Sequence, residues 1–317
     1  MPVEIPKLDY SGKIREITLG AGEHSVVVGG EDSYPFYLFE GNLPNPPKIA
    51  FEIYDSGPED CPKALKDVFG DALSDPVKWA VKCAEEFSAD LICLRLASTD
   101  PNGEDKNAGD VIPVVQRVIE AVGVPIIVWG SENDDKDAGV LAAVAEACHG
   151  KKLVIGPATE SNYKRVGAAC IAYGHTVVAG TPIDINLAKQ LNILLGDLGV
   201  PDEQIIIDPN VGGSSLGYGL EYTYSVMERL RQAALTQQDA KLQFPMILNC
   251  AMDVWKKREV NVSAEEEPTL GDEKERGVIF EALNSAVLLA AGADIVVIRH
   301  PESADLIRKT AGELAEE

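Results

Sequence analysis

Basic residues, clustered cysteines and long apolar runs are all scarce in this sequence of 317 residues. It has 28 lysine and arginine residues against 51 aspartate and glutamate residues, which gives a formal net charge of −23. Proteins bind nucleic-acid backbones and anionic lipids through lysine and arginine, so we expect neither a nucleic-acid nor a membrane partner. No apolar run reaches the roughly 18 residues of a membrane span, and no secretion signal is evident at the start.

The cysteines stand singly along the chain, at positions 61, 83, 93, 148, 170 and 250. None forms a C-x-x-C pair, the spacing that is typical of structural zinc and iron–sulfur sites. We therefore expect no iron–sulfur cluster in this chain. Unpaired cysteines also indicate a reducing compartment, so we expect a cytoplasmic location. An apolar fraction of 45% excludes wholesale disorder.

From about residue 48 onward, short β-branched runs alternate with longer segments of helical periodicity. The strands predicted from these runs cover residues 49–54, 91–96, 125–129, 152–155, 175–179, 204–207, 245–248 and 294–298. The helical segments cover residues 108–122, 134–148, 183–198, 218–235 and 272–291. This alternation is typical of an α/β fold with a parallel sheet, and eight such units predict a (β/α)8 TIM barrel.

Two regions depart from this repeat. Residues 14–19 and 25–30 flank a glycine-bearing turn and predict a β-hairpin, so we divide the chain into an extension (1–47) and a barrel (48–317). The hairpin would either cover the N-terminal end of the barrel or offer a strand edge to a partner. Residues 252–271 contain three consecutive glutamates and predict an irregular, solvated acidic loop.

In a TIM barrel, function is located at the C-terminal ends of the strands. The side chains expected there are mostly acidic or amide groups, without a paired nucleophile and base. Ser215 stands in a G-x-S-x-G motif, but the predicted strand ends too early for a hydrolase nucleophile. His300 follows the last strand, where it would be either a loop residue or an acid–base group.

The most informative segment follows the sixth strand. The carboxylate of Asp208 and the carboxamide of Asn210 could bind the edge of a flat heterocycle, since one accepts hydrogen bonds and the other both accepts and donates. Gly212 and Gly213 would let the backbone approach such a ligand closely. Alternatively, Asp208 caps the next turn and Asn210 holds a left-handed position.

Three segments resemble one known family. Residues 49–55 (IAFEIYD), 154–163 (VIGPATESNY) and 206–213 (IIDPNVGG) are similar to the small subunit of the corrinoid iron–sulfur protein of acetyl-CoA synthesis. The archaeal members are called the delta subunit of the acetyl-CoA decarbonylase/synthase complex. The resemblance extends over nearly the whole chain, including the N-terminal hairpin.

The resemblance implies a barrel paired in a heterodimer with a large subunit, which holds an iron–sulfur cluster and most of a corrinoid (cobalamin) site. The barrel mouth would cover the corrinoid while methyl passes from the methyltetrahydrofolate methyltransferase to acetyl-CoA synthase. The chain would then need no catalytic residues of its own, because the cofactor supplies the reactive atom. The residues expected to line this cover are Thr159, Glu160, Asp208, Asn210, Gly212, Gly213, Arg95, Trp129, Asn249 and His300.

Two other functions stay open at this point. A pterin-dependent barrel methyltransferase would use Asp208 and Asn210 directly on methyltetrahydrofolate. An unrelated barrel lyase or aldolase would need a lysine at the mouth for a Schiff base, and no predicted strand ends in one.

Overall fold

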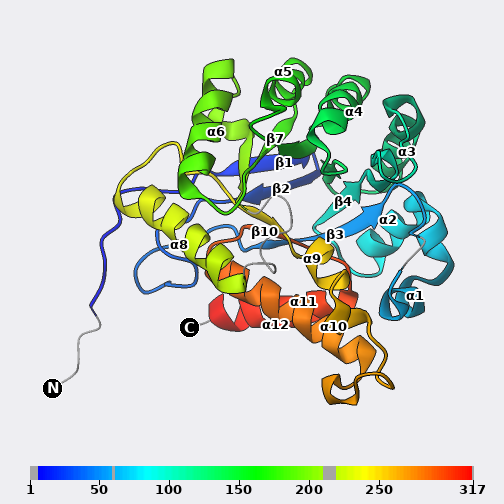
Figure 1. Cartoon of the computed structure of the whole chain (residues 1–317). Coiled ribbons are helices and arrows are strands. Elements are labelled where there is room, and N and C mark those ends of the chain that lie inside the picture. The colour runs from blue at the N-terminus through cyan, green and yellow to red at the C-terminus, as the bar shows by residue number, and fades with distance from the viewer. Residues whose placement is uncertain (1–5, 59–60, 210–218, 316–317) are drawn as a thin grey trace.

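The computed structural model describes residues 6–58, 61–209 and 219–315. Within these ranges, a single parallel sheet of eight strands forms the centre of the molecule (Figure 1). Its strands are β3 (Lys48–Tyr54), β4 (Leu91–Arg95), β5 (Ile126–Trp129), β6 (Val154–Ala158), β7 (Thr176–Gly180), β8 (Ile205–Asp208), β9 (Ile247–Asn249) and β10 (Ile295–Ile298). All eight predicted strands are confirmed, with boundaries that differ by a few residues.

The sheet curls into a nearly closed barrel. The strand order is β8-β7-β6-β5-β4-β3-β10-β9, so chain neighbours pair in turn. The remaining gap is bridged where Ile207 pairs in parallel with Met246 and donates its N–H to the Pro245 carbonyl at 2.9 Å. The predicted TIM barrel is therefore confirmed.

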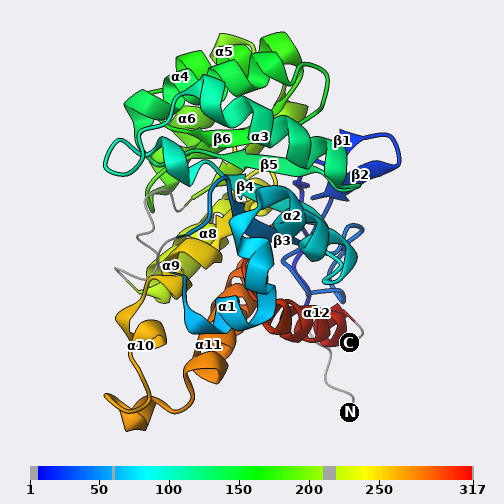
Figure 2. The same ribbon diagram turned by 90° about the vertical axis from the view of Figure 1, so that its right-hand side faces the viewer.

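Helices cover the outside of the barrel, with α3 to α6 on one side and α8, α11 and α12 on the other (Figures 1 and 2). They are α1 (Lys63–Phe69), α2 (Pro76–Glu85), α3 (Ala108–Ala121), α4 (Asp134–Ala147), α5 (Tyr163–Tyr173), α6 (Ile185–Leu198), α8 (Leu220–Thr236), α9 (Cys250–Trp255), α10 (Arg258–Asn261), α11 (Glu273–Ala290) and α12 (Pro301–Ala315). The described part of the chain contains no helix that is long and apolar enough to cross a membrane.

Alternate strand residues build an apolar core inside the barrel. Its strand members are Ala50, Leu91, Cys93, Ile127, Trp129, Val154, Val178, Ile206, Ile247, Ile295 and Val297. The residues between them face the helices, and strands buried on both faces account for the nearly continuous apolar runs in the sequence. Trp129 pairs in register with Gly156, so a large side chain on one strand lies beside a residue with none.

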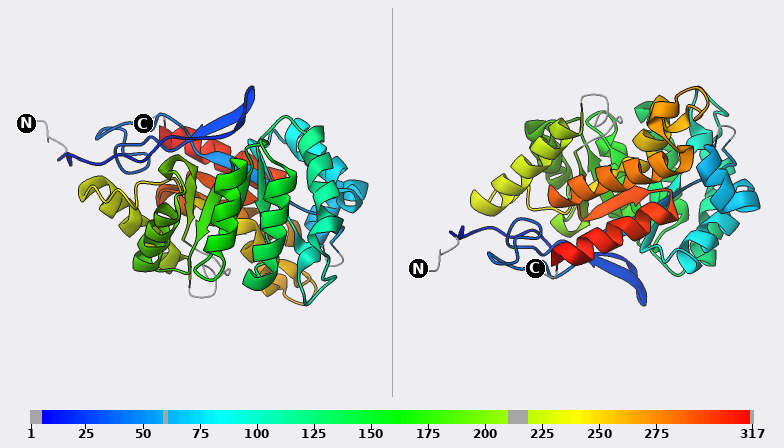
Figure 3. Two further views of the ribbon diagram at one scale, coloured as in Figure 1. Left: turned by 90° about the horizontal axis from the view of Figure 1, so that it is seen from above. Right: turned by 90° about the horizontal axis from the view of Figure 1, so that it is seen from below.

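The N-terminal hairpin covers the N-terminal end of the barrel. It consists of β1 (Ile17–Ala21) and β2 (His24–Val28), which pair antiparallel. Ile17, Leu19 and Val28 join the apolar core inside the barrel. Figure 3 shows the hairpin at the end opposite to α9 and α10. Its apolar face therefore packs under the barrel, as the first of the two predicted alternatives requires.

A buried ionic cluster fastens this extension to the barrel. Arg231 on α8 is 1% exposed and contacts Glu31 at 2.8 Å as well as Asp294, which precedes β10. Asp294 also accepts the backbone N–H of Met246 at 2.7 Å. Burial raises the pKa of Glu31 to about 7, against the opposing effect of Arg231. Two carboxylates thus share one guanidinium, an arrangement that favours keeping one proton.

Residues 252–271 are not one irregular loop, so that expectation is wrong. Helix α9 runs directly from the end of β9, because the Asn249 side chain caps it by accepting the Met252 N–H at 3.3 Å. Val254 and Trp255 are buried, and α10 follows. The acidic part, 265–267, does lie at the surface. The turns of α9 and α10 are too short for a periodic signal to emerge from the sequence.

Candidate functional site

A buried ion pair fills one half of the barrel mouth. Arg299, just after β10, donates to the same oxygen of Glu52 on β3 through Nε at 2.7 Å and Nη2 at 2.5 Å. Asn249 donates to the other Glu52 oxygen at 2.9 Å, and Arg299 also contacts the Tyr54 hydroxyl. Burial alone would raise the pKa of Glu52, but Arg299 and Arg95 outweigh it and hold that pKa below its ordinary value. Glu52 is therefore a carboxylate at neutral pH.

A second buried carboxylate positions the end of β10. Glu281 on α11 is fully buried and accepts the backbone N–H of Arg299 at 2.8 Å and that of His300 at 3.0 Å. It also accepts the indole N–H of Trp255 at 2.7 Å. Glu281 therefore fixes the backbone from which Arg299 reaches into the barrel.

The His300 side chain points away from the inside of the barrel, toward the surrounding helices. It is fully buried, its ring stacks on Trp255 with centroids 5.9 Å apart, and its Nδ1 accepts the Glu302 N–H at 3.2 Å. Burial lowers its pKa to about 4, so the ring is neutral at neutral pH. The structure thus places His300 among the helices rather than with the mouth side chains. Residues along a strand alternate in direction, and Arg299 takes the inward position.

Arg95 and Glu132 connect the filled half of the mouth to the other half. Arg95, the last residue of β4, is 6% exposed and lies 3.3 Å from a carboxylate oxygen of Glu132. Glu132 has a left-handed backbone with φ of 75°. Asp137 on α4 holds this turn, since its carboxylate accepts the N–H groups of Ser131 and Glu132, both at 2.9 Å. Strain of this kind is stored where a side chain must be aimed precisely.

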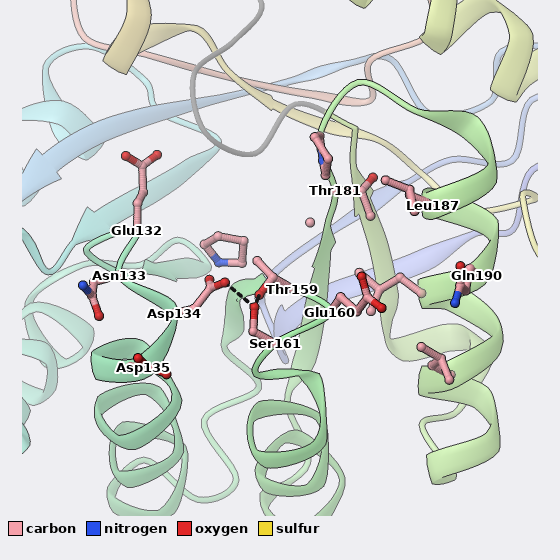
Figure 4. A pocket seen from close by; sticks show the side chains of 15 residues that line it. Glu132, Asn133, Asp134, Asp135, Thr159, Glu160, Ser161, Thr181, Leu187 and Gln190 are labelled. Atoms are coloured by element: carbon pink, nitrogen blue, oxygen red, sulfur yellow. Dashed lines mark hydrogen bonds between the residues drawn. The ribbon is translucent and has the colours of Figure 1, made fainter.

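The other half of the mouth is hollow. A cavity of about 660 Å³ opens between the ends of β5, β6 and β7 and helix α6 (Figure 4). Its polar lining consists of Glu132, Asn133, Asp134, Asp135, Thr159, Glu160, Ser161, Thr181 and Gln190. Leu187, Leu191 and Leu194 form an apolar wall on α6. The cavity is thus acidic and rich in hydroxyl groups, with one apolar side.

Local contacts order this cavity. Ser161 donates to Asp134 at 2.5 Å, and the N–H of Thr159 donates to the side chain of Asn162 at 2.8 Å. Thr181 is 4% exposed, and its hydroxyl has no hydrogen-bond partner among the described residues. Gly180, at the end of β7, also lines the cavity and places no side chain into it.

The predicted site residues fall into three groups. Arg95, Trp129, Asp208 and Asn249 are all buried, at the C-terminal ends of their strands. Thr159 and Glu160 line the cavity, so the structure brings these two groups together at one end of the barrel. Asn210, Gly212 and Gly213 lie outside the described residues, and His300 points away. Whether any of them contacts a cofactor stays a prediction.

Sequence reasoning missed three glutamates of the site, Glu52, Glu132 and Glu281. Glu52 left a readable signal, because it interrupts the apolar run between Phe51 and Ile53 of a strand that is buried on both sides. A charge there needs a partner of opposite sign, and Arg299 at the end of the last strand was available. Nothing in the sequence singles out Glu132 or Glu281.

The cysteines are all buried and unpaired. Within the ranges described, no three histidine, cysteine or carboxylate side chains are grouped so that they could hold a metal ion.

A second hollow lies on the outer helices. It measures about 720 Å³ and is lined by residues of α8, α10 and α11, among them Leu220, Val260 and Phe280. Ile279 and Leu283 on α11 border it and are each 57% exposed. Contiguous exposed apolar side chains of this kind often mark contact surfaces.

Comparison with solved structures supports the barrel. A dihydropteroate synthase from Xanthomonas albilineans, in complex with indole-2-carboxylic acid and 6-chloroguanine, superposes with a TM-score of 0.59. It covers 94% of this chain and 99% of its own length at 16% sequence identity. A Yersinia pestis dihydropteroate synthase with a bound sulfonamide drug gives a TM-score of 0.56 over 86% of this chain and 95% of its own, at 15% identity. At such identities the likeness concerns the fold alone.

Sequence relatives are more specific. Subunit delta of the acetyl-CoA decarbonylase/synthase complex from Archaeoglobus fulgidus is 37% identical over 315 residues, which is 96% of this chain and 69% of the relative. The subunit delta of Methanopyrus kandleri is 32% identical over 94% of this chain and 72% of its own length. The family model described as "CO dehydrogenase/acetyl-CoA synthase delta subunit" matches residues 16–309. This chain therefore belongs to the family of the CO dehydrogenase/acetyl-CoA synthase delta subunit, and the resemblance seen in the sequence is confirmed.

Proposed function

We propose that this chain is the small subunit of a corrinoid methyl carrier in acetyl-CoA metabolism. Its barrel mouth would cover a corrinoid that a large, iron–sulfur-bearing subunit holds. The assembly would accept methyl from a methyltetrahydrofolate methyltransferase and deliver it to acetyl-CoA synthase. The observation that carries the proposal is the half-filled mouth, which offers a polar cavity but groups no nucleophile with a base among the described residues.

The side chains of the mouth fit the rim of a corrinoid. A corrin ring carries amide side chains around an apolar edge, and the cavity pairs acceptor oxygens with the leucine wall of α6. Thr181 keeps a buried hydroxyl without a partner in the described part of the chain. Bound there, the corrinoid would supply a cobalt centre that carries the methyl group. The residues of this chain would orient the ring and exclude water.

The ion pair gives this cover a fixed shape. Arg299 and Asn249 both donate hydrogen bonds to the Glu52 carboxylate, and Glu281 accepts the backbone N–H of Arg299. A mouth braced in this way can present the cavity without rearranging when a ligand binds, which limits the entropic cost of binding. The exposed apolar hollow beside α11 offers surface for a neighbouring subunit to bury.

The alternative is a pterin-binding methyltransferase, in which the buried carboxylate of Asp208 would bind the heterocycle directly. Asn249, on the next strand, is already engaged with Glu52. Methyltetrahydrofolate binding to the chain alone, measured by tryptophan fluorescence and lost in Asp208→Ala, would favour this alternative over a purely covering role.

Hydrogen–deuterium exchange tests the proposed role. We expect the corrinoid-loaded large subunit to protect backbone amides after β5, β6 and β7, at residues 131–135, 159–162 and 181–184. The hairpin strands β1 and β2 lie at the other end of the barrel and serve as an internal control. Equal protection at both ends, or none at the mouth, would contradict the proposal.

A further inference from the structure

Arg95 is a buried cation with unused hydrogen-bond donors. A guanidinium has five N–H donors, and the side chain is 6% exposed. Its Nη2 contacts Glu132 at 3.3 Å, whereas its buried Nη1 has no partner among the described residues. Burying a donor without an acceptor destabilises a protein, so this position calls for an acceptor from outside the described chain.

Trp129 presents a second unused donor on the same wall. It pairs in register with Arg95 across β4 and β5, and it is 2% exposed. The residues two positions earlier, Cys93 and Ile127, both belong to the core inside the barrel, so Arg95 and Trp129 share its inner face. The indole Nε1 has no acceptor within the described ranges. Two buried donors thus stand side by side at the end of the barrel that carries the cavity.

The carboxyl groups around this pair outnumber the cations. Arg95, Arg299 and Lys256 lie near Glu52 and Glu132, Asp253 acts on Glu132, and Glu281 acts on Arg299. These interactions appear in the pKa of Lys256, which burial and Arg95 lower, and in the pKa of Glu132, which burial raises. Three cations against four carboxyl groups leave no excess positive charge for an anionic ligand to neutralise. The missing group is therefore an uncharged acceptor.

Because the Glu132 carboxylate accepts hydrogen bonds, a ligand that also contacts it needs hydrogen-bond donors. This carboxylate is close to Arg95 and also lines the cavity, together with Thr159 and Thr181. A ligand group at this boundary meets N–H donors on one side and oxygen acceptors on the other. A primary carboxamide has both faces, since its carbonyl accepts and its NH₂ donates.

We infer that Arg95 and Trp129 form a site for a primary carboxamide, with the carbonyl oxygen toward the two donors and the NH₂ toward Glu132. This inference rests on the proposed function, because the rim of a corrin ring bears several such carboxamides. It assigns Arg95 and Trp129 the recognition of a ring substituent, and no part in the chemistry at cobalt.

Tryptophan NMR tests the inference directly. The chain has three tryptophans, so ¹⁵N-labelled full-length protein gives three indole N–H signals, each assignable from a Trp→Phe variant. Dicyanocobinamide is a diamagnetic corrinoid that keeps its side-chain amides. We expect it to move the Trp129 signal downfield. Trp79, another buried indole without a partner in the described chain, lies on α2 and should stay in place, as should Trp255.

Two variants complete the experiment. Trp129→Phe keeps an aromatic side chain but loses the N–H donor, and Arg95→Lys keeps the charge but loses Nη1. Each should weaken cobinamide binding about threefold to tenfold by calorimetry, whereas Trp79→Phe should bind like the wild type. Binding by the wild type with an unmoved Trp129 signal and unaffected variants would overturn the inference while leaving the proposed function intact. If millimolar cobinamide does not bind to the chain at all, the inference falls, whereas the exchange experiment on the complex tests the proposed function separately.

Discussion

Arg299 and Glu52 are 247 positions apart in the chain, yet Arg299 donates two hydrogen bonds to a single oxygen of the Glu52 carboxylate inside the barrel mouth. The pair joins the first strand of the barrel to the last, where β3 and β10 lie side by side. It therefore fastens two neighbouring strands together at the C-terminal end of the barrel.

We expect Arg299→Met to destabilise the protein by about 3–5 kcal/mol, because it leaves Glu52 buried without its counter-ion. The free energy of unfolding, measured in urea, checks this value. The double variant Glu52→Gln/Arg299→Met removes both charges and should recover part of the loss. A single variant that unfolds like the wild type would show that the pair does not brace the barrel.

His300 predicts a pH dependence of stability. Its pKa is lowered to about 4 in the folded protein, against an ordinary value of 6.5. Between these values the unfolded chain binds more protons than the folded one, so stability rises with pH across that window. The contribution is at most about 3 kcal/mol. His300→Asn should flatten the slope, as measured by urea unfolding at several pH values. An unchanged slope would contradict the assignment.

Glu31 predicts the opposite trend. Burial raises its pKa to about 7, so the folded protein binds more protons than the unfolded chain from about 4.5 upward, and stability falls as pH rises through this range. Glu31→Gln should therefore gain stability relative to the wild type as the pH increases from about 5 to about 8. Glu16→Gln, an exposed carboxylate on the same extension, serves as the control. A constant difference between Glu31→Gln and the wild type would argue against a shared proton in the Arg231 cluster.

Filling the cavity should impair the cover without unfolding the protein. Gln190 is exposed on α6 and lines the cavity, whereas Asn186 is exposed on the same helix and does not contribute to the lining. We expect Gln190→Trp to slow methyl transfer by the assembled complex about tenfold, a loss of about 1.4 kcal/mol in transition-state stabilisation. Asn186→Trp should transfer methyl at the normal rate. Equal activity of both variants would exclude the cavity from the site.

The fold was largely predictable from the sequence because buried parallel strands leave apolar runs that stand out between turns. Besides α9 and α10, helices α1, α2, α5 and α12 lie outside the predicted helical segments. The buried face of α5 includes small residues such as Gly167, Ala169 and Cys170, which give a weak periodic signal. Strand boundaries also differ from the prediction. β6 begins at Val154 rather than at Lys152, and it runs on to Ala158.

The site was predictable only in part. Strand ends identified Arg95, Trp129, Asp208 and Asn249, because position along the barrel strand decides which residues reach the mouth. The direction of the His300 side chain could not be predicted in the same way. Successive strand residues point alternately into the barrel and toward the helices, so an error of one residue reverses the prediction. Glu132 depends on a left-handed turn that Asp137 holds from the next helix, and such a tertiary contact has no local signature.

Co-purification from the native source tests the central claim most directly. The account predicts that a tagged copy of this chain brings along a larger second chain, and that the pair shows both iron–sulfur and corrinoid absorbance. The chain expressed alone should show neither. Recovery of this chain without a partner, or with a cluster or a tightly held corrinoid of its own, would contradict the account.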